Sequence, residues 1–142
     1  QPLSPTHFSL SVHNAVIGLW SIMRGETSEM TALAAAGDGL EHGMLEAAAM
    51  LDEGAPAVLL IVTEEQPPDA YAHWIDDVPF AYAVGLLLMP GEQWQVSLAS
   101  GGASTDKARW PHALNLLCHL FDEQTSFQHT WKNRVWNWQR SL

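Results

Sequence analysis

Histidine is the residue type in this sequence with the widest chemical use, and seven are present: His7, His13, His42, His73, His112, His119 and His129. Two metal ligands on one helix need a spacing of three or four residues. His112 and His119 are seven residues apart with no carboxylate between them. His42 and Glu46 have the right spacing, but on a helix face that we expect to be solvated. We therefore expect no metal site and no cofactor.

Two serines are candidate nucleophiles. Ser9 and His13 are four residues apart, which would bring them within reach on one helix, and Ser11 is a second candidate. A serine of this kind more often caps a helix than reacts. The sequence contains no G-x-S-x-G elbow, G-x-G-x-x-G turn or P-loop. An acyltransferase that uses a serine with His13 therefore remains open, without a motif to support it.

The composition excludes several classes of protein. The 142 residues suit one domain, and an apolar fraction of 47% indicates a folded chain. The 16 acidic and 6 basic residues give a net charge of −10. Proteins that bind nucleic acid or an anionic membrane need many basic residues, so the charge excludes both classes. No apolar run reaches the roughly 18 residues that span a bilayer. The chain begins with Gln1, and we expect that an N-terminal segment is missing.

Residues 9–24 predict a helix that is apolar on most faces and is therefore buried. Gly25 follows it as a typical C-terminal cap. Ser11, Ala15 and Gly18 form a stripe of small residues on this helix. Such a stripe allows another backbone to approach closely, so we expect a tightly packed partner helix.

The rest of the chain alternates helical and strand-like patterns. Helices are predicted over residues 40–53 and 111–121, with Glu41 on the solvent side of the first. Strands are predicted over residues 29–35, 56–63, 80–89 and 93–98, and residues 127–140 fit either structure. The continuous apolar run at 56–63 is typical of a strand covered on both faces. This order predicts an α/β fold with a mixed sheet covered by helices. We expect one domain over residues 1–142, with a Gly/Ser loop at 99–106 before a Trp-rich C-terminal part.

Residues 8–30, FSLSVHNAVIGLWSIMRGETSEM, resemble the helix that follows the nucleophilic cysteine in β-ketoacyl synthases. Residues 24–26 and Met30 match the end of that pattern, and residues 11–14 match its start. Counting back from Gly25 without gaps places the nucleophile position on Phe8. The glycine that usually follows the cysteine has no clear counterpart, and the strand at 80–89 lacks most of the family's glycines.

The chain as a whole resembles the chain-length-factor family, short β-ketoacyl synthase-like proteins of aryl polyene and fatty-acid-type clusters. SPTHFSLSVHNAVIGLWSI at residues 4–22 and PAVLLIVTEEQPP at residues 56–68 carry the likeness. It implies half of a thiolase-like fold, without the half that supplies the catalytic histidines. It also implies a non-catalytic cytoplasmic subunit that pairs with a complete ketosynthase and helps to measure acyl length, because Phe8 cannot be acylated.

The resemblance further implies which residues border the interface and the acyl tunnel: Phe8, Ser11, Val12, Ala15, Val16, Gly18 and Trp20. Acyl carrier proteins are acidic, and residues 1–105 hold 13 acidic residues against Arg24 alone. We therefore expect this chain to contact the carrier protein only indirectly, through a basic partner. A structural homodimer without acyl chemistry is the third possibility.

Overall fold

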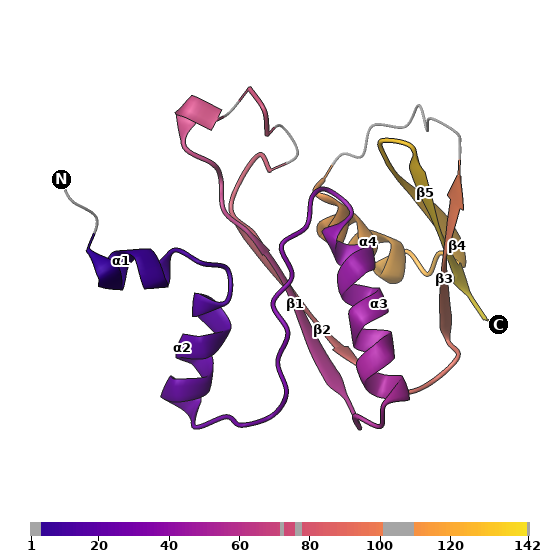
Figure 1. Cartoon of the computed structure of the whole chain (residues 1–142). Helices are drawn as coiled ribbons and strands as arrows, with labels where there is room; N and C mark the ends of the chain where they lie inside the picture. Colours follow the sequence, from indigo (N-terminus) through magenta and orange to yellow (C-terminus); the bar gives the residue numbers. More distant parts are fainter. Residues whose placement is uncertain (1–3, 72, 76–77, 101–109, 142) are drawn as a thin grey trace. The chain divides into compact units, whose positions relative to one another are not determined.

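The structure is a computed structural model that describes residues 4–71, 73–75, 78–100 and 110–141, the Ser100 side chain excepted. The chain divides into two compact units, residues 1–34 and 35–142 (Figure 1). Within the described ranges, no helix is both long and apolar enough to cross a membrane.

The first unit contains two helices, α1 (Pro5–Leu10) and α2 (Ala15–Arg24). The single helix predicted over residues 9–24 is therefore wrong. Ser11 ends α1 because its hydroxyl and its amide both donate to the carbonyl of Phe8, at 2.7 and 3.0 Å. Serine hydroxyls compete with the helical hydrogen bonds in this way. Gly25 ends α2 in the left-handed conformation, with φ of 63°, as the sequence predicts.

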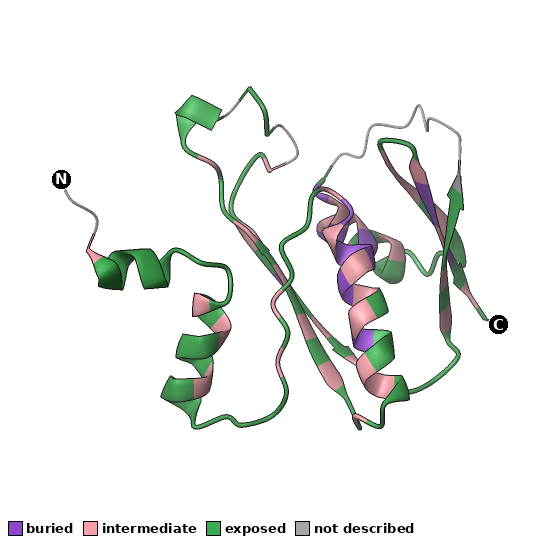
Figure 2. Ribbon diagram, viewed as in Figure 1, coloured by how far each residue is buried: buried purple, intermediate pink, exposed green. Residues whose placement is uncertain are grey.

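The helices of the first unit are not buried, contrary to expectation (Figure 2). Val16 is 70% exposed and Met23 is 82% exposed. A Cβ atom added at Gly18 would meet no described atom within 4 Å, so no packed backbone uses the predicted stripe of small residues there. An apolar surface therefore remains uncovered on this unit.

The strand predicted over residues 29–35 is also wrong, since the structure describes no strand there. Three alanines lie among these seven residues, and alanine has a low preference for strands. A strand also needs a neighbour to pair with, and no described segment pairs with this one.

The second unit begins with helix α3 (Gly39–Asp52), which packs against the first strand of a hairpin. The hairpin consists of β1 (Val58–Glu64) and β2 (Tyr82–Leu88), antiparallel and separated by a loop with a short 3-10 helix (Asp69–Tyr71). Gly43 on α3 lets β1 approach closely, because a Cβ atom at Gly43 would lie 2.8 Å from Cδ1 of Leu60 on β1.

A three-stranded antiparallel sheet and helix α4 (His112–Phe121) complete the unit. Its strands are β3 (Trp94–Ser100), β4 (Ser126–Trp131) and β5 (Arg134–Arg140), in the order β3-β5-β4. The ambiguous segment 127–140 is thus a hairpin. Its tight turn is possible because Lys132 adopts φ of 55°. The predicted Gly/Ser loop at 99–106 begins inside β3 and otherwise lies outside the described residues.

The strands are divided between two antiparallel sheets instead of one mixed sheet. Parallel pairs need a long crossover between successive strands, and neither β1–β2 nor β4–β5 has a helix of that kind between them. Within the second unit only one face of β1 is covered, because Leu59 and Ile61 are 59% and 55% exposed. The expectation of a strand covered on both faces is therefore corrected.

The core joins α3, α4 and both sheets. Its buried members are Leu40, Val84, Ala113, Leu116, Trp136 and Trp138. The two tryptophans lie on β5 and are each 2% exposed, so alternation along the strand turns both inward. Trp136 and Trp138 of the tryptophan-rich C-terminal part are therefore core residues.

A buried ion pair ties the start of α3 to β5. Asp38 is 1% exposed, and Nη2 of Arg134 donates to its Oδ1 at 2.8 Å, while Nε of Arg134 lies 2.8 Å from Oδ2. Nε1 of Trp136 donates to the same Oδ2 at 3.1 Å, and His42 lies 3.5 Å away. The carboxylate also lies at the N-terminus of α3, where the helix dipole favours negative charge.

Removing Arg134 should leave Asp38 as a buried charge without its cation. We expect Arg134→Ala to lower the free energy of unfolding by about 2–3 kcal/mol. The lower part of the range for broken buried pairs applies because the Arg134 side chain is 39% exposed and water can partly replace it. Urea denaturation of the full-length protein measures the change.

Arg140→Ala is the matched control, since Arg140 ends the same strand and its side chain makes no ion pair with any described residue. Equal losses for the two variants would contradict a specific role of the Asp38–Arg134 pair.

Candidate functional site

A groove of about 920 Å³ opens in the second unit. Residues at the start of α3 and of α4 line it, together with strand β4 and the ends of β1 and β2 that join the connecting loop. His112, His119 and His129 are among the lining side chains. The groove is the place in this unit where polar, titratable groups and open space coincide.

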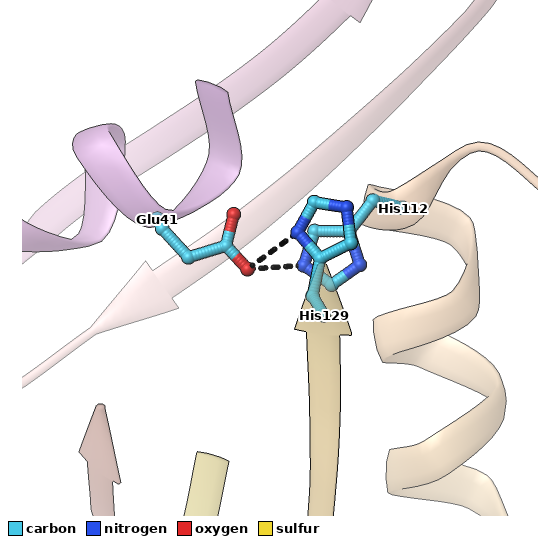
Figure 3. A group of neighbouring side chains, drawn as sticks. All are labelled: Glu41, His112 and His129. Carbon is cyan, nitrogen blue, oxygen red and sulfur yellow. Dashed lines mark hydrogen bonds and ion pairs between the residues drawn. The ribbon is translucent and has the colours of Figure 1, made fainter. Parts of the chain in front are cut away.

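The centre of this site is Glu41, in the first turn of α3 and 0% exposed (Figure 3). One of its oxygens, Oε1, accepts three hydrogen bonds. They come from Nε2 of His112, from Nδ1 of His129 at 3.1 Å and from Nε1 of Trp138 at 3.0 Å. The imidazole rings of His112 and His129 are stacked, with centroids 3.4 Å apart and planes at 11°.

Each element brings one of these side chains for a simple local reason. His112 is the first residue of α4, directly after Pro111, which favours a helix start at that point. His129 points inward from β4, and Trp138 points inward from β5. The register that pairs His129 with Trp136 also places Trp138 on the same sheet face, two residues further along.

The charges of the cluster follow from burial and hydrogen bonding. Burial alone would raise the pKa of Glu41, but the hydrogen bonds and charges of His112 and His129 outweigh it and lower that pKa to about 2. Burial lowers the pKa of His112 despite the neighbouring carboxylate. At neutral pH the site therefore holds an ionised Glu41 and an uncharged His112.

The residues predicted for the interface and tunnel all lie in the first unit. Phe8 belongs to α1, Ser11 and Val12 to the turn, and Ala15, Val16, Gly18 and Trp20 to α2. Ala15 is half-buried and the other six are exposed. They form one short apolar segment, and whether they border an interface or a tunnel stays a prediction.

The serine–histidine arrangement does not form. Ser9 lies in α1 and donates to the carbonyl of Pro5 at 3.0 Å, and Ser11 donates to the carbonyl of Phe8. His13 lies in the turn after α1, so the i, i+4 relation with Ser9 is lost. Among the described hydrogen bonds, none links either serine to His13.

Sequence reasoning missed the Glu41 cluster. Glu41 was expected on the solvent side of its helix, next to the core residue Leu40, and it is fully buried instead. Its partners lie 71, 88 and 97 residues away on three other elements, so no local spacing could reveal them. The spacing of three or four residues applies only to two ligands on one helix. Glu41, His112 and His129 come from three different elements, so that spacing could not reveal them.

Comparison with known proteins identifies the family of this chain. The model of the β-ketoacyl synthase N-terminal domain matches residues 1–139. Among curated proteins, none matches this chain. A chain in the structure of a ketosynthase (ApeO) in complex with its chain length factor (ApeC), from Xenorhabdus doucetiae, matches with a TM-score of 0.85 and 26% sequence identity.

That match covers 99% of this chain and 59% of the other, so this chain spans about three fifths of the chain it resembles. The half thiolase-like fold implied by the resemblance of the whole chain is thereby confirmed, with its strands in two sheets. The protein belongs to the β-ketoacyl synthase N-terminal domain family.

Proposed function

We propose that this protein is a non-catalytic, chain-length-factor-like subunit. It pairs with a complete ketosynthase in aryl polyene or other fatty-acid or polyketide-type biosynthesis. The observation that carries the proposal is the match of the fold to a chain from a structure of a ketosynthase with its chain length factor, and the predicted place of Phe8 at the nucleophile position supports it.

Phe8 supports the lack of catalysis on chemical grounds. Condensation needs a thiol or hydroxyl to carry the acyl group, and a phenyl ring has no lone pair with which to form the ester. Ser9 and Ser11 are the nearest hydroxyls in the sequence, and both donate their protons to helix carbonyls. Among the described hydrogen bonds, neither hydroxyl is bonded to His13, the base that the serine mechanism would need. The serine acyltransferase is therefore the weaker alternative.

The uncovered surface of α1 and α2 supports a partner. Phe8 and Val16 are 65% and 70% exposed, and Trp20 is 50% exposed beneath the guanidinium of Arg24, 5.2 Å from its ring centre. Exposed apolar surface of this extent is typical of a protein interface. A complete ketosynthase fits the family best, while a second copy of this chain is the homodimer alternative.

The acidic charge fits the same role. A net charge of −10 disfavours direct docking of an acidic acyl carrier protein, which the partner ketosynthase would receive on a basic surface. The carrier protein would then meet this chain only at the subunit boundary. We also propose that the pair works in the cytoplasm.

Co-expression tests the partnership. The full-length protein and the ketosynthase encoded beside it should co-purify as a heterodimer, because each covers apolar surface of the other. Mass in solution at low concentration distinguishes a heterodimer from a homodimer. If the two proteins never co-purify and elongation is unchanged without this protein, the proposal fails.

A change at Val16 tests the tunnel. Val16→Trp should shift the products to shorter acyl chains, because the larger side chain would fill space that the growing chain occupies. Mass spectrometry of the products measures the shift. Ile22→Trp is the control, since Ile22 lies on another face of the same helix and is 80% exposed. Identical product lengths for Val16→Trp and the unchanged protein would contradict the tunnel assignment.

Acyl labelling tests the lack of catalysis. After incubation with an acyl carrier protein that bears a thioester, peptides with Ser9 and Ser11 should carry no acyl group, while the cysteine of the partner ketosynthase should be acylated. Peptide mass spectrometry reads both results in one sample. A stoichiometric acyl group on Ser9 would restore the serine acyltransferase.

A further inference from the structure

We propose that Glu41, His112 and His129 form a binding site for one divalent transition-metal ion of the zinc type. Their ligand atoms all lie within 4.8 Å of one another. Two imidazoles and one carboxylate, with an open fourth position, are a donor set that zinc uses in proteins. The inference concerns the second unit only and does not depend on the proposed function.

The hydrogen bonds at Glu41 are unevenly shared between its two oxygens. A carboxylate oxygen has two lone pairs, yet three N–H donors converge on Oε1. The other oxygen, Oε2, is buried and has no hydrogen-bond partner among the described residues. Full burial without a partner is costly for a charged oxygen. An ion between the carboxylate and the two imidazoles would relieve the crowding at Oε1 and could also engage Oε2.

The charge of the cluster also points to a cation. Asp38 and Glu41 are both buried and lie one helical turn apart, and Asp38 has Arg134 as its partner. Within the described residues, no lysine or arginine pairs with Glu41, which has only ring N–H donors. A buried carboxylate is stable when a cation or metal ion compensates it. A divalent ion would supply that charge.

The two histidines are able to bind as neutral ligands. In the ion-free state the nitrogens that face the carboxylate carry the protons, and ion binding moves each proton to the other ring nitrogen. Trp138 would keep its hydrogen bond to Oε1 and so orient the carboxylate, as outer partners of metal ligands commonly do. His112 and His129 both line the groove, so water or a small ligand can reach the fourth position.

Metal titration of the full-length protein tests the site. After removal of metals with a chelator, Zn²⁺ should bind with a stoichiometry of one in calorimetry, and Co²⁺ should give the visible absorption of a tetrahedral centre. His129→Gln should weaken Zn²⁺ binding by about tenfold or more, because losing a direct metal ligand costs at least as much affinity as losing a residue that only orients a ligand. Glu41→Gln should also weaken it, because the charge is lost while the shape is kept.

His119→Gln is the matched control. His119 lies on α4 and lines the same groove, but its ring stacks on Phe127 at 4.2 Å and belongs to no ligand group. Binding should be unchanged in this variant, and circular dichroism confirms that each variant is folded. The proposal is overturned if the unchanged protein binds less than one equivalent of Zn²⁺ and Co²⁺. It is also overturned if His119→Gln weakens binding as much as His129→Gln does.

Discussion

Two buried carboxylates at the start of α3 are the constraint on which the second unit depends. Asp38 and Glu41 are 1% and 0% exposed, and their side-chain hydrogen bonds come from other elements. All their strong partners come from the last thirty-one residues of the chain, from α4, β4 and β5. Burying a carboxylate is unfavourable unless donors meet it, so α3 and the C-terminal strands must assemble together.

This constraint also explains the use of tryptophan. An indole gives a large apolar surface and one N–H donor, and Trp136 and Trp138 each use both. Their rings build the core between α4 and the sheet, while their N–H groups reach Asp38 and Glu41. A phenylalanine at either position would pack but would remove one of the N–H donors to the buried carboxylate. The tryptophan-rich end and the acidic helix start are therefore two parts of one interaction.

The first unit poses the opposite problem. Its helices are short and apolar, and their side chains stay exposed within this unit, so the unit by itself gains little free energy from burying them. These exposed apolar side chains are the structural feature of the first unit that supports the proposed partner subunit.

Much of the secondary structure could be predicted, and the failures have physical reasons. Strands β1, β2 and β3 and helices α3 and α4 follow from apolar runs and local periodicity. The sequence analysis missed the break after Leu10, which arises because the Ser11 side chain competes with the helical hydrogen bonds. The signal of a single serine is weaker in the sequence than the apolar pattern around it. The strand at 29–35 failed because a strand needs a neighbour, which a sequence pattern does not provide.

By itself, the sequence indicated the family, through residues 8–30, and predicted that Phe8 occupies the nucleophile position. These conclusions rest on residue identities along one segment, which no packing can change. Only the tertiary structure decided the Glu41 cluster and the Asp38 ion pair. Both join residues about 70 to 100 positions apart, and their burial and hydrogen bonds exist only once α3, α4 and the β4–β5 hairpin are packed together.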